Sequence, residues 1–311
     1  MKLCLIALLV LAFPALCAEN YWPGWLGPKR DGWVKGFEPP KKWPAKLKQV
    51  WQLKVGEGYG TPVVVGNHVY QHARQGEEEV VWAVDLKTGK KIWRSGYNTP
   101  FKMGGGGEKH GKGPKSNPTY ADGRLFVMSI TGTLSSWDAA SGNLLWRKNY
   151  NSRFKPSHPY WGMCNSPVVD GNRVIAHFGN VEKGVLVALD VKTGKEIWAQ
   201  GEDGPCYSSP LLVEHEGIRQ VIEWNHRALV GVESKTGKLL WEFPFPHTGT
   251  NQNMPTPSFA KGRVLLGGEN RGLHGIEPKL ENGKWTVKAY WSHRKVALDM
   301  SSAVVNDGRL Y

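Results

Sequence analysis

Apolar and polar positions alternate along most of the chain in short runs, and Gly, Asp and Asn separate one run from the next. Two such runs are Val81-WAV-Asp85 and Arg173-VIA-His177. Alternation bounded by turn residues is typical of β-strands. Helical periodicity is lacking outside the apolar run at the N-terminus. The pattern therefore predicts an all-β protein built from short strands.

One phrase recurs along the chain: an acidic residue, a turn that contains glycine, and a tryptophan eight positions after the acid. Its copies are Asp85–Trp93, Asp138–Trp146, Asp190–Trp198 and Glu233–Trp241, with a looser fifth copy from Glu277 to Trp291. Successive tryptophans are 53, 52, 43 and 50 residues apart. A period of roughly 40–50 residues made of short strands is typical of a β-propeller with one repeat per blade.

Each repeat is predicted to hold four strands, which we name A to D in chain order. Strand A opens at a Ser-Pro, Thr-Pro or similar step, strand B follows a glycine turn, strand C ends on the acid, and strand D carries the tryptophan. A flat side chain that recurs once per blade can wedge between neighbouring sheets, and the backbone of the next blade can accept its indole N–H. We therefore expect equivalent, mostly buried structural positions for Trp93, Trp146, Trp198 and Trp241.

The phrase Ala83-VDLKTGKKI-Trp93 resembles the tryptophan-docking repeat of the pyrroloquinoline quinone (PQQ)-like propellers, and Ala188-LDVKTGKEI-Trp198 matches it as fully. The segment Trp22-PGWLGPKRD-Gly32 resembles the N-terminal segment of secreted bacterial members. The resemblance covers about residues 21–311. It implies four-stranded antiparallel blades, with seven or eight in a complete ring. The superfamily includes quinoprotein dehydrogenases and the lipoprotein of the outer-membrane β-barrel assembly machine, so the resemblance implies a fold and no single function.

The chain is predicted to have three parts. Residues 1–18 are expected to be a signal peptide cut near Ala18, because a short apolar run follows Lys2 and small residues follow the run. Residues 19–50 are an N-terminal extension, and residues 51–311 are the propeller. The propeller part comprises a ring-closing strand around Trp51, five blades and the start of a sixth. Because the sixth blade stops after strand B, we expect a C-terminal truncation.

A lipid anchor at Cys17 is the alternative at the N-terminus, although Pro14-Ala15-Leu16 is a poor match to the lipoprotein cleavage motif. The mature chain would retain Cys164 and Cys206, which either form a disulfide in an oxidising compartment or remain two buried thiols. We expect no membrane-spanning segment after the signal peptide is removed.

The formal net charge is +13, and many of the cations lie in the A–B and C–D turns, which share one face. A positive face can attract polyanions, but solvated turns also favour lysine after glycine. Nucleic acid is not expected as a partner, because the chain is predicted to be exported and carries no known nucleic-acid-binding motif.

The D–A and B–C connections lie on the opposite face, where the sequence is least repetitive, and variable loops on a repeated scaffold often carry function. We predict ligand binding there by Tyr160, Trp161 and Tyr207 as an aromatic platform, with His177 and His226 supplying polar contacts. The combination suits sugars or peptide segments. The alternative is that these aromatic side chains only plug the funnel.

Two functions follow as hypotheses. The first is a non-catalytic scaffold, periplasmic or secreted, that binds a protein or polysaccharide of the cell envelope. The second is a divergent PQQ-dependent alcohol or sugar dehydrogenase, although the Glu, Asn and Asp set of those enzymes has no matching motif here. Asn251, Asn253 and Asp299 could supply oxygen ligands to Ca²⁺, and the alternative is that they are ordinary polar residues of the loops. The chain lacks the adjacent cysteine pair of methanol-type members and a C-x-x-C-H haem motif. We assign no catalytic residue and no metal site, and we expect no bound cofactor.

Overall fold

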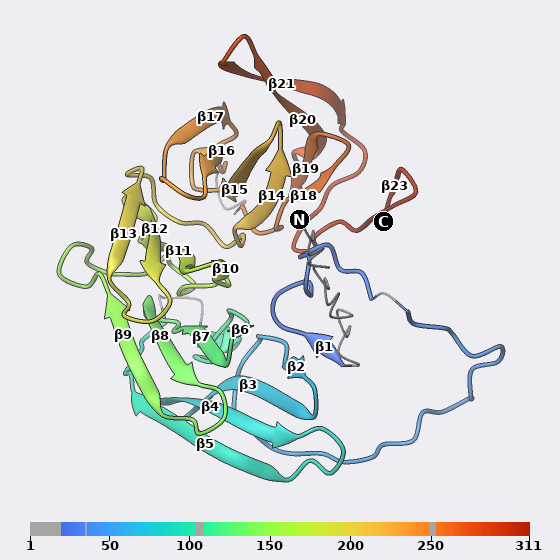
Figure 1. Cartoon of the computed structure of the whole chain (residues 1–311), viewed down its shortest axis with the longest axis vertical. Helices are drawn as coiled ribbons and strands as arrows, with labels where there is room; N and C mark the ends of the chain where they lie inside the picture. Colours follow the sequence, from blue (N-terminus) through green and yellow to red (C-terminus); the bar gives the residue numbers. More distant parts are fainter. Residues whose placement is uncertain (1–19, 35, 104–107, 249–252) are drawn as a thin grey trace, which may run out of the picture.

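The computed structural model describes residues 20–34, 36–103, 108–248 and 253–311, which fold almost entirely into antiparallel β-sheets (Figure 1). The one helix in these ranges is a 3-10 turn, η1 (Glu108–His110). Within the same ranges, no helix has the length and apolarity needed to cross a membrane. The predicted signal peptide at 1–18, including Cys17, lies outside the described residues.

Five sheets follow one another along the chain, and we number them as blades 1 to 5. Blade 1 consists of β2 (Val63–Val65), β3 (His68–Gln75), β4 (Glu78–Asp85) and β5 (Lys91–Asn98). Blade 2 consists of β6 (Thr119–Ala121), β7 (Arg124–Met128), β8 (Thr133–Asp138) and β9 (Leu144–Asn149). Blade 3 consists of β10 (Val168–Asp170), β11 (Arg173–Gly179), β12 (Gly184–Asp190) and β13 (Glu196–Gln200). Blade 4 consists of β14 (Leu211–His215), β15 (Ile218–Trp224), β16 (Ala228–Glu233) and β17 (Leu239–Pro244). Blade 5 consists of β18 (Ser258–Ala260), β19 (Arg263–Gly268), β20 (Gly272–Glu281) and β21 (Lys284–His293).

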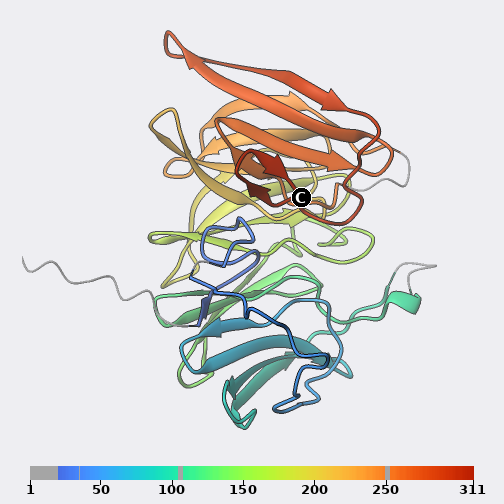
Figure 2. The same ribbon diagram turned by 90° about the vertical axis from the view of Figure 1, so that its right-hand side faces the viewer.

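Strands within each blade pair in sequence order, each antiparallel to the next. The blades stand side by side in an arc, with strand A innermost and strand D outermost (Figure 1). A short hairpin of β22 (Val305–Asn306) and β23 (Arg309–Leu310) follows blade 5. Seen from the side, the blades stack along the long axis of the molecule (Figure 2). The predicted all-β architecture of four-stranded antiparallel blades is confirmed, and the number of blades in a complete ring stays a prediction.

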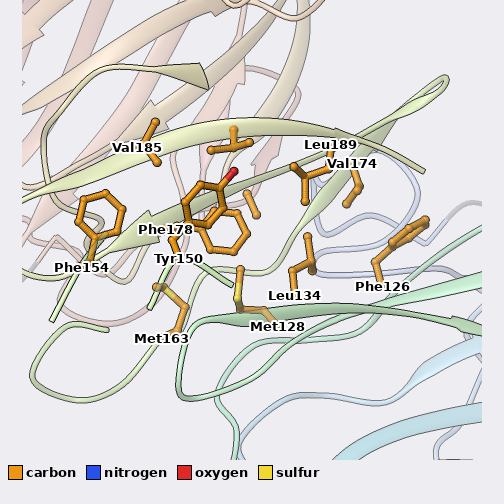
Figure 3. Close-up of a cluster of buried hydrophobic side chains, with 12 residues drawn as sticks. Phe126, Met128, Leu134, Tyr150, Phe154, Met163, Val174, Phe178, Val185 and Leu189 are labelled. Carbon is orange, nitrogen blue, oxygen red and sulfur yellow. The ribbon is translucent and has the colours of Figure 1, made fainter. Parts of the chain in front are cut away.

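Apolar side chains hold neighbouring blades together. Between blades 2 and 3, Phe126 and Leu134 lie in one buried cluster with Val174 and Val185 (Figure 3). Comparable clusters fill the interfaces between the other successive blades. Truncating one fully buried side chain of this size costs about 2–5 kcal/mol. The arc is therefore one continuous series of sheet-on-sheet cores.

The repeated tryptophans tie each blade to the next. The indole of Trp146 in blade 2 packs against Gly194 in the C–D turn of blade 3, and its N–H donates to the carbonyl oxygen of Val191 (3.1 Å). A Cβ at Gly194 would lie 2.8 Å from this indole, so the turn requires glycine. The same arrangement joins Trp93 to Gly142 and Ala139, and Trp198 to Gly237 and Ser234.

Trp51 repeats this docking on the first blade. Its indole lies against Gly89, and its N–H donates to the carbonyl oxygen of Leu86 (2.8 Å). It therefore occupies the place that a preceding blade's tryptophan would take. Residues 51–56 belong to no strand of the described structure, and the ring-closing pairing of this segment stays a prediction.

Trp241 is buried and keeps the strand register of the other tryptophans, pairing with Gly231 as Trp198 pairs with Ala188, but it does not dock on the next blade. Its N–H donates to Gln220 Oε1 (2.9 Å) within its own blade, and its indole covers Gly231. The reason lies in blade 5, where β20 runs on past the expected end at Glu277 and turns into β21 at Asn282-Gly283. That hairpin replaces the Thr-Gly turn that would have received the indole.

Part of the predicted N-terminal extension lies along the inner strands. β1 (Tyr21–Trp22) pairs with β2 of blade 1, and the carbonyl oxygen of Pro23 accepts the N–H of Tyr120 in blade 2. The buried guanidinium of Arg30 donates to the carbonyl oxygens of Ser166 (3.1 Å) and Pro210 (2.7 Å), which precede the A strands of blades 3 and 4. This segment therefore links the blades at the centre of the arc.

Candidate functional site

Hydroxyl side chains position the loops that enter the A strands. In blades 3 to 5 the A strand begins directly after the predicted Ser-Pro or Thr-Pro step. The Ser or Thr of each step therefore lies in the loop before the strand. Ser166 Oγ accepts the N–H of Asn117 (2.9 Å), and Ser209 Oγ accepts the N–H of Ser166 (2.9 Å). Thr256 and Ser302 continue the series. These bonds run from blade to blade and fix the ends of the D–A loops, where the chain enters the A strands, relative to one another.

Tyr160 and Trp161 lie on the D–A loop between blades 2 and 3. The two rings meet edge to face, with centroids 4.9 Å apart. Tyr160 is 43% exposed, whereas Trp161 is half-buried and packs on a small apolar cluster that contains Phe101 and Ile130. The pair therefore presents an exposed ring that rests on a fixed one.

Tyr207 lies beneath this pair. It is 9% exposed, and its hydroxyl oxygen accepts the backbone N–H of Trp161 (3.1 Å). Burial raises the pKa of the Tyr207 phenol, so the group stays neutral. The structure brings the three predicted aromatic residues together. Tyr207, however, is buried and holds the loop in place, which is the packing role that the alternative gave to these side chains.

Two exposed side chains that sequence reasoning missed extend the aromatic surface. The ring of His110 meets Trp161 edge to face at 4.9 Å, and Tyr59 donates from its hydroxyl to the carbonyl oxygen of His110 (2.6 Å). Tyr59 is 60% exposed. We call Tyr59, His110, Trp161 and Tyr160 the aromatic surface. Its members come from three successive D–A loops. The sequence signal for Tyr59 was its place in the glycine-rich loop Gly56-EGY-Gly60.

His177 is buried and links blades 3 and 4 through its ring nitrogens. Its Nδ1 lies 2.7 Å from Glu223 Oε1, and its Nε2 lies 2.8 Å from the carbonyl oxygen of Asp203. Burial alone would lower the pKa of His177, but the Glu223 carboxylate and the Asp203 carbonyl outweigh it, so the pKa is raised. Both ring nitrogens of His177 are therefore engaged within the protein, and the residue is 2% exposed.

His226 lies in the B–C connection of blade 4. Its ring centroid is 3.8 Å from that of His247, and its Nδ1 is 3.5 Å from Cys206 Sγ. Burial, together with the nearby His247 and Arg227, lowers the pKa of His226 to about 4. No hydrogen bond or ring contact in the described parts of the chain joins His177 or His226 to Trp161. Contact of either histidine with a ligand at the aromatic surface stays a prediction.

Both cysteines in the described residues are free thiols, which answers the alternative that the sequence left open. Cys206 is buried, Cys164 is partly buried, and burial raises the pKa of each thiol to about 12. The two side chains are therefore unreactive apolar groups at neutral pH.

The residues on this face do not fit the Ca²⁺ ion that a quinone cofactor would need. Asn253 Oδ1 accepts from Arg271 Nη2 (2.6 Å), and Asn253 Nδ2 donates to the carbonyl oxygen of Asn225 (2.8 Å). The Asn253 oxygen thus already faces a guanidinium, whereas a Ca²⁺ site needs 6–8 oxygen ligands. Asn251 lies outside the described residues. In the part of the chain that is described, no three His, Cys, Asp or Glu side chains gather as metal ligands.

The arc of antiparallel blades, joined by tryptophans docked on glycine turns, defines a β-propeller of the tryptophan-docking class. The chain belongs to the family described as outer membrane protein assembly factor BamB, whose model matches residues 44–101 and 77–311.

Curated relatives fall into two groups. BamB of Burkholderia pseudomallei (strain K96243) is 27% identical over 242 residues, which cover 64% of this chain and 60% of that protein. The quinohemoprotein alcohol dehydrogenase ADH-IIG of Pseudomonas putida is 30% identical over 159 residues, which cover 49% of this chain and 21% of that protein. The chain thus spans about a fifth to three fifths of the length of these relatives.

Solved structures show the same division. BamB from Moraxella catarrhalis superposes with a TM-score of 0.54 at 17% identity and covers 78% of this chain and 64% of its own. The quinohemoprotein alcohol dehydrogenase from Comamonas testosteroni has a TM-score of 0.54 at 18% identity and covers 76% of this chain and 43% of its own. These likenesses show the fold.

Proposed function

We propose that the protein is a non-catalytic scaffold of the bacterial cell envelope, periplasmic or secreted, that binds a protein partner in outer-membrane assembly. The observation that carries the proposal is the family match, which extends over nearly the whole chain after residue 43. Support also comes from coverage, because the chain aligns with 60% of the Burkholderia assembly factor but with 21% of the Pseudomonas dehydrogenase.

The aromatic surface is the proposed contact region. Tyrosine and tryptophan are enriched at the energetic centres of protein interfaces, where a large rigid ring buries much area for little lost entropy. Here the rings are held in place before binding, because Trp161 rests on buried apolar side chains and Tyr59 is hydrogen-bonded to His110. Such preorganisation lowers the entropic cost of association.

The test is the double variant Tyr59→Ala/Tyr160→Ala. Capture of outer-membrane assembly proteins from a solubilised bacterial envelope, quantified by mass spectrometry, should fall about tenfold or more if both rings are interface centres. The matched control is Tyr290→Ala/Tyr311→Ala, which removes two tyrosines that are 54% and 68% exposed elsewhere on the chain. Equal capture by the double variant and the parent protein would contradict the proposed contact region. Capture of envelope polysaccharide in place of protein would contradict the proposed partner.

A dehydrogenase function is the second candidate, and the 30% identity to quinohemoprotein alcohol dehydrogenase favours it. The arrangement of Asn253 and Arg271 speaks against it. The test is reconstitution with PQQ and Ca²⁺, followed by dye reduction with alcohols and sugars as substrates. Turnover that depends on added PQQ would replace the scaffold proposal, and an Arg271→Ala variant would show whether the guanidinium blocks cation binding.

A further inference from the structure

A cavity of about 800 Å³ opens between blades 1 and 2, on the same face as the aromatic surface but further from the centre of the arc. The ends of β5 and β9 form its walls, together with the D–A loops that follow them. We call this cavity the inter-blade groove. Its volume lies in the range of ligand-binding clefts.

The charges that line the inter-blade groove are all positive. Lys102, Arg147 and Lys155 line it with exposed side chains, and none of the lining residues is acidic. Within the described residues, no ion pair engages any of these three cations. Glu77 lies beside the lining residue Thr99, but its carboxylate pairs with Lys112 and Arg74 at 3.2 and 3.7 Å rather than with a cation of the groove. A concave surface with one sign of charge concentrates ligands of the opposite sign.

One of the cations has a fixed position. The guanidinium carbon of Arg147 lies 4.6 Å from the ring centroid of Tyr97, which is a cation–π distance. Arg147 therefore offers its N–H groups from a defined place, and a guanidinium can bind a carboxylate through two parallel hydrogen bonds. The groove is thus suited to carboxylate groups rather than only to diffuse negative charge.

The remaining lining favours a peptide over a saccharide. Exposed amide side chains at Asn98, Asn149 and Asn151 can each donate to and accept from a peptide backbone. A sugar would need an open aromatic face to stack on. The groove offers none from its phenylalanines, because Phe101 and Phe154 are each 5% exposed, and Arg147 covers Tyr97.

We propose that the inter-blade groove binds an acidic, extended segment of a protein partner, with its carboxylates on Arg147, Lys102 and Lys155. The inference rests on the proposed function, since it takes the partner to be a protein, and it adds the chemistry of the segment recognised. One loop serves both places: residues 154–158 line the groove, and Tyr160 and Trp161 belong to the aromatic surface. A single partner can therefore contact both.

The experiment uses a fluorescein-labelled synthetic peptide with Asp at alternate positions, and a second peptide with Asn at those positions. Fluorescence anisotropy with the purified protein should show binding of the Asp peptide that weakens as salt rises, and little binding of the Asn peptide. The triple variant Lys102→Gln/Arg147→Gln/Lys155→Gln should weaken binding by roughly 3- to 150-fold, since it removes three exposed charge pairs.

The matched control is Lys87→Gln/Lys192→Gln/Lys235→Gln, which removes the same charge from exposed turns on the opposite face. Retained binding by this control together with loss in the groove variant supports the inference. Equal loss in both variants would mean that net charge alone attracts the peptide, and would overturn it. Preference of the groove for an oligogalacturonate of similar charge would also overturn it, in favour of a saccharide.

This assay needs no natural partner, so it separates the two proposals. Failure of the Asp peptide alongside normal capture of assembly proteins by the aromatic surface would overturn the groove inference alone. Peptide binding that depends on the groove, without any capture of assembly proteins, would instead overturn the proposed partner.

Discussion

Replacement of Gly194 by alanine should show how much the docked tryptophan contributes to the joint between blades 2 and 3. Gly194 has a positive φ of +67°, and an added Cβ would lie 2.8 Å from the Trp146 indole. The substitution therefore imposes two costs: backbone strain in the left-handed region and displacement of the indole from its hydrogen bond to Val191.

The first cost can be subtracted with a control in the same blade. Gly171 has a φ of +58°, and a Cβ there would meet nothing within 4 Å. Gly171→Ala should thus show only the left-handed strain, about 1–2 kcal/mol, less the gain of roughly 0.4–1 kcal/mol from a stiffer unfolded chain. Gly194→Ala should destabilise by about 1–3 kcal/mol more, from overpacking and a weakened hydrogen bond.

Urea unfolding of both variants, followed by circular dichroism and tryptophan fluorescence, measures the difference. A second background tests the cause: in a Trp146→Ala protein, Gly194→Ala should cost no more than Gly171→Ala, because the clashing ring is gone. Equal destabilisation by Gly194→Ala and Gly171→Ala in the parent protein would refute the docking argument. So would an undiminished Gly194→Ala effect in the Trp146→Ala background.

Three further outcomes are expected. Arg30→Met should lower the free energy of unfolding by about 1–3 kcal/mol, because buried carbonyl oxygens lose their donor. The same variant should be cleaved faster by a protease within residues 20–33. Unchanged proteolysis would contradict the role of this segment in linking the blades. Stability should peak near pH 6.5, the ordinary pKa of histidine. The raised pKa of His177 stabilises the folded state at low pH, and this contribution is lost as the pH rises above 6.5. The pKa of His226 is lowered to about 4, so its contribution to stability is lost as the pH falls below 6.5. His177→Asn should flatten the alkaline limb and His226→Asn the acid limb, as read from urea midpoints across pH. Cys164 and Cys206 should react slowly with a thiol reagent at about pH 8 in the folded protein and quickly in urea; fast labelling of the folded protein would show that one of them is accessible.

The repeat allowed the blades to be predicted because its information is local. The acid, the glycine turn and the tryptophan lie within nine residues, and their chemistry is the same wherever the turn occurs. Asp190, for example, accepts the N–H and hydroxyl of Thr193 within the turn that holds Gly194. Because these contacts all lie within one turn, the turn can be predicted from the sequence without knowledge of the neighbouring blades.

Trp241 and Arg30 show what could not be read this way. The place of Trp241 depends on a receptor some 40 residues further on, where Asn282-Gly283 closes a hairpin in place of the docking turn. Arg30 donates to main-chain carbonyls 136 and 180 residues away, and such acceptors carry no sequence signature. Both depend on neighbours that only the assembled arc provides.

Some of the predicted site residues could be placed from the repeat alone, whereas others depend on contacts with a neighbouring blade. Tyr160 and Trp161 could be placed on a loop at the correct face by strand polarity alone. Tyr207 is buried and accepts a hydrogen bond from Trp161 on the preceding D–A loop, and the partner of His177 is a glutamate in the next blade. Residue type and position in the repeat indicate the face, whereas burial is decided by the neighbouring blade.

The same division explains why this fold does not decide function by itself. Docking turns and tryptophans lie at one face and hold the arc together, so they are compatible with an assembly factor and with a dehydrogenase alike. The loops of the opposite face do not hold the blades together through docked tryptophans. Side-chain contacts in these loops are therefore where the two functions would differ. In this chain Arg271 bonds to the oxygen of Asn253 that a cation would need, while Tyr59 and Tyr160 present exposed rings on a supported base. These contacts support the proposed macromolecular contact, and the Arg271→Ala variant tests whether the guanidinium keeps a cation from this face.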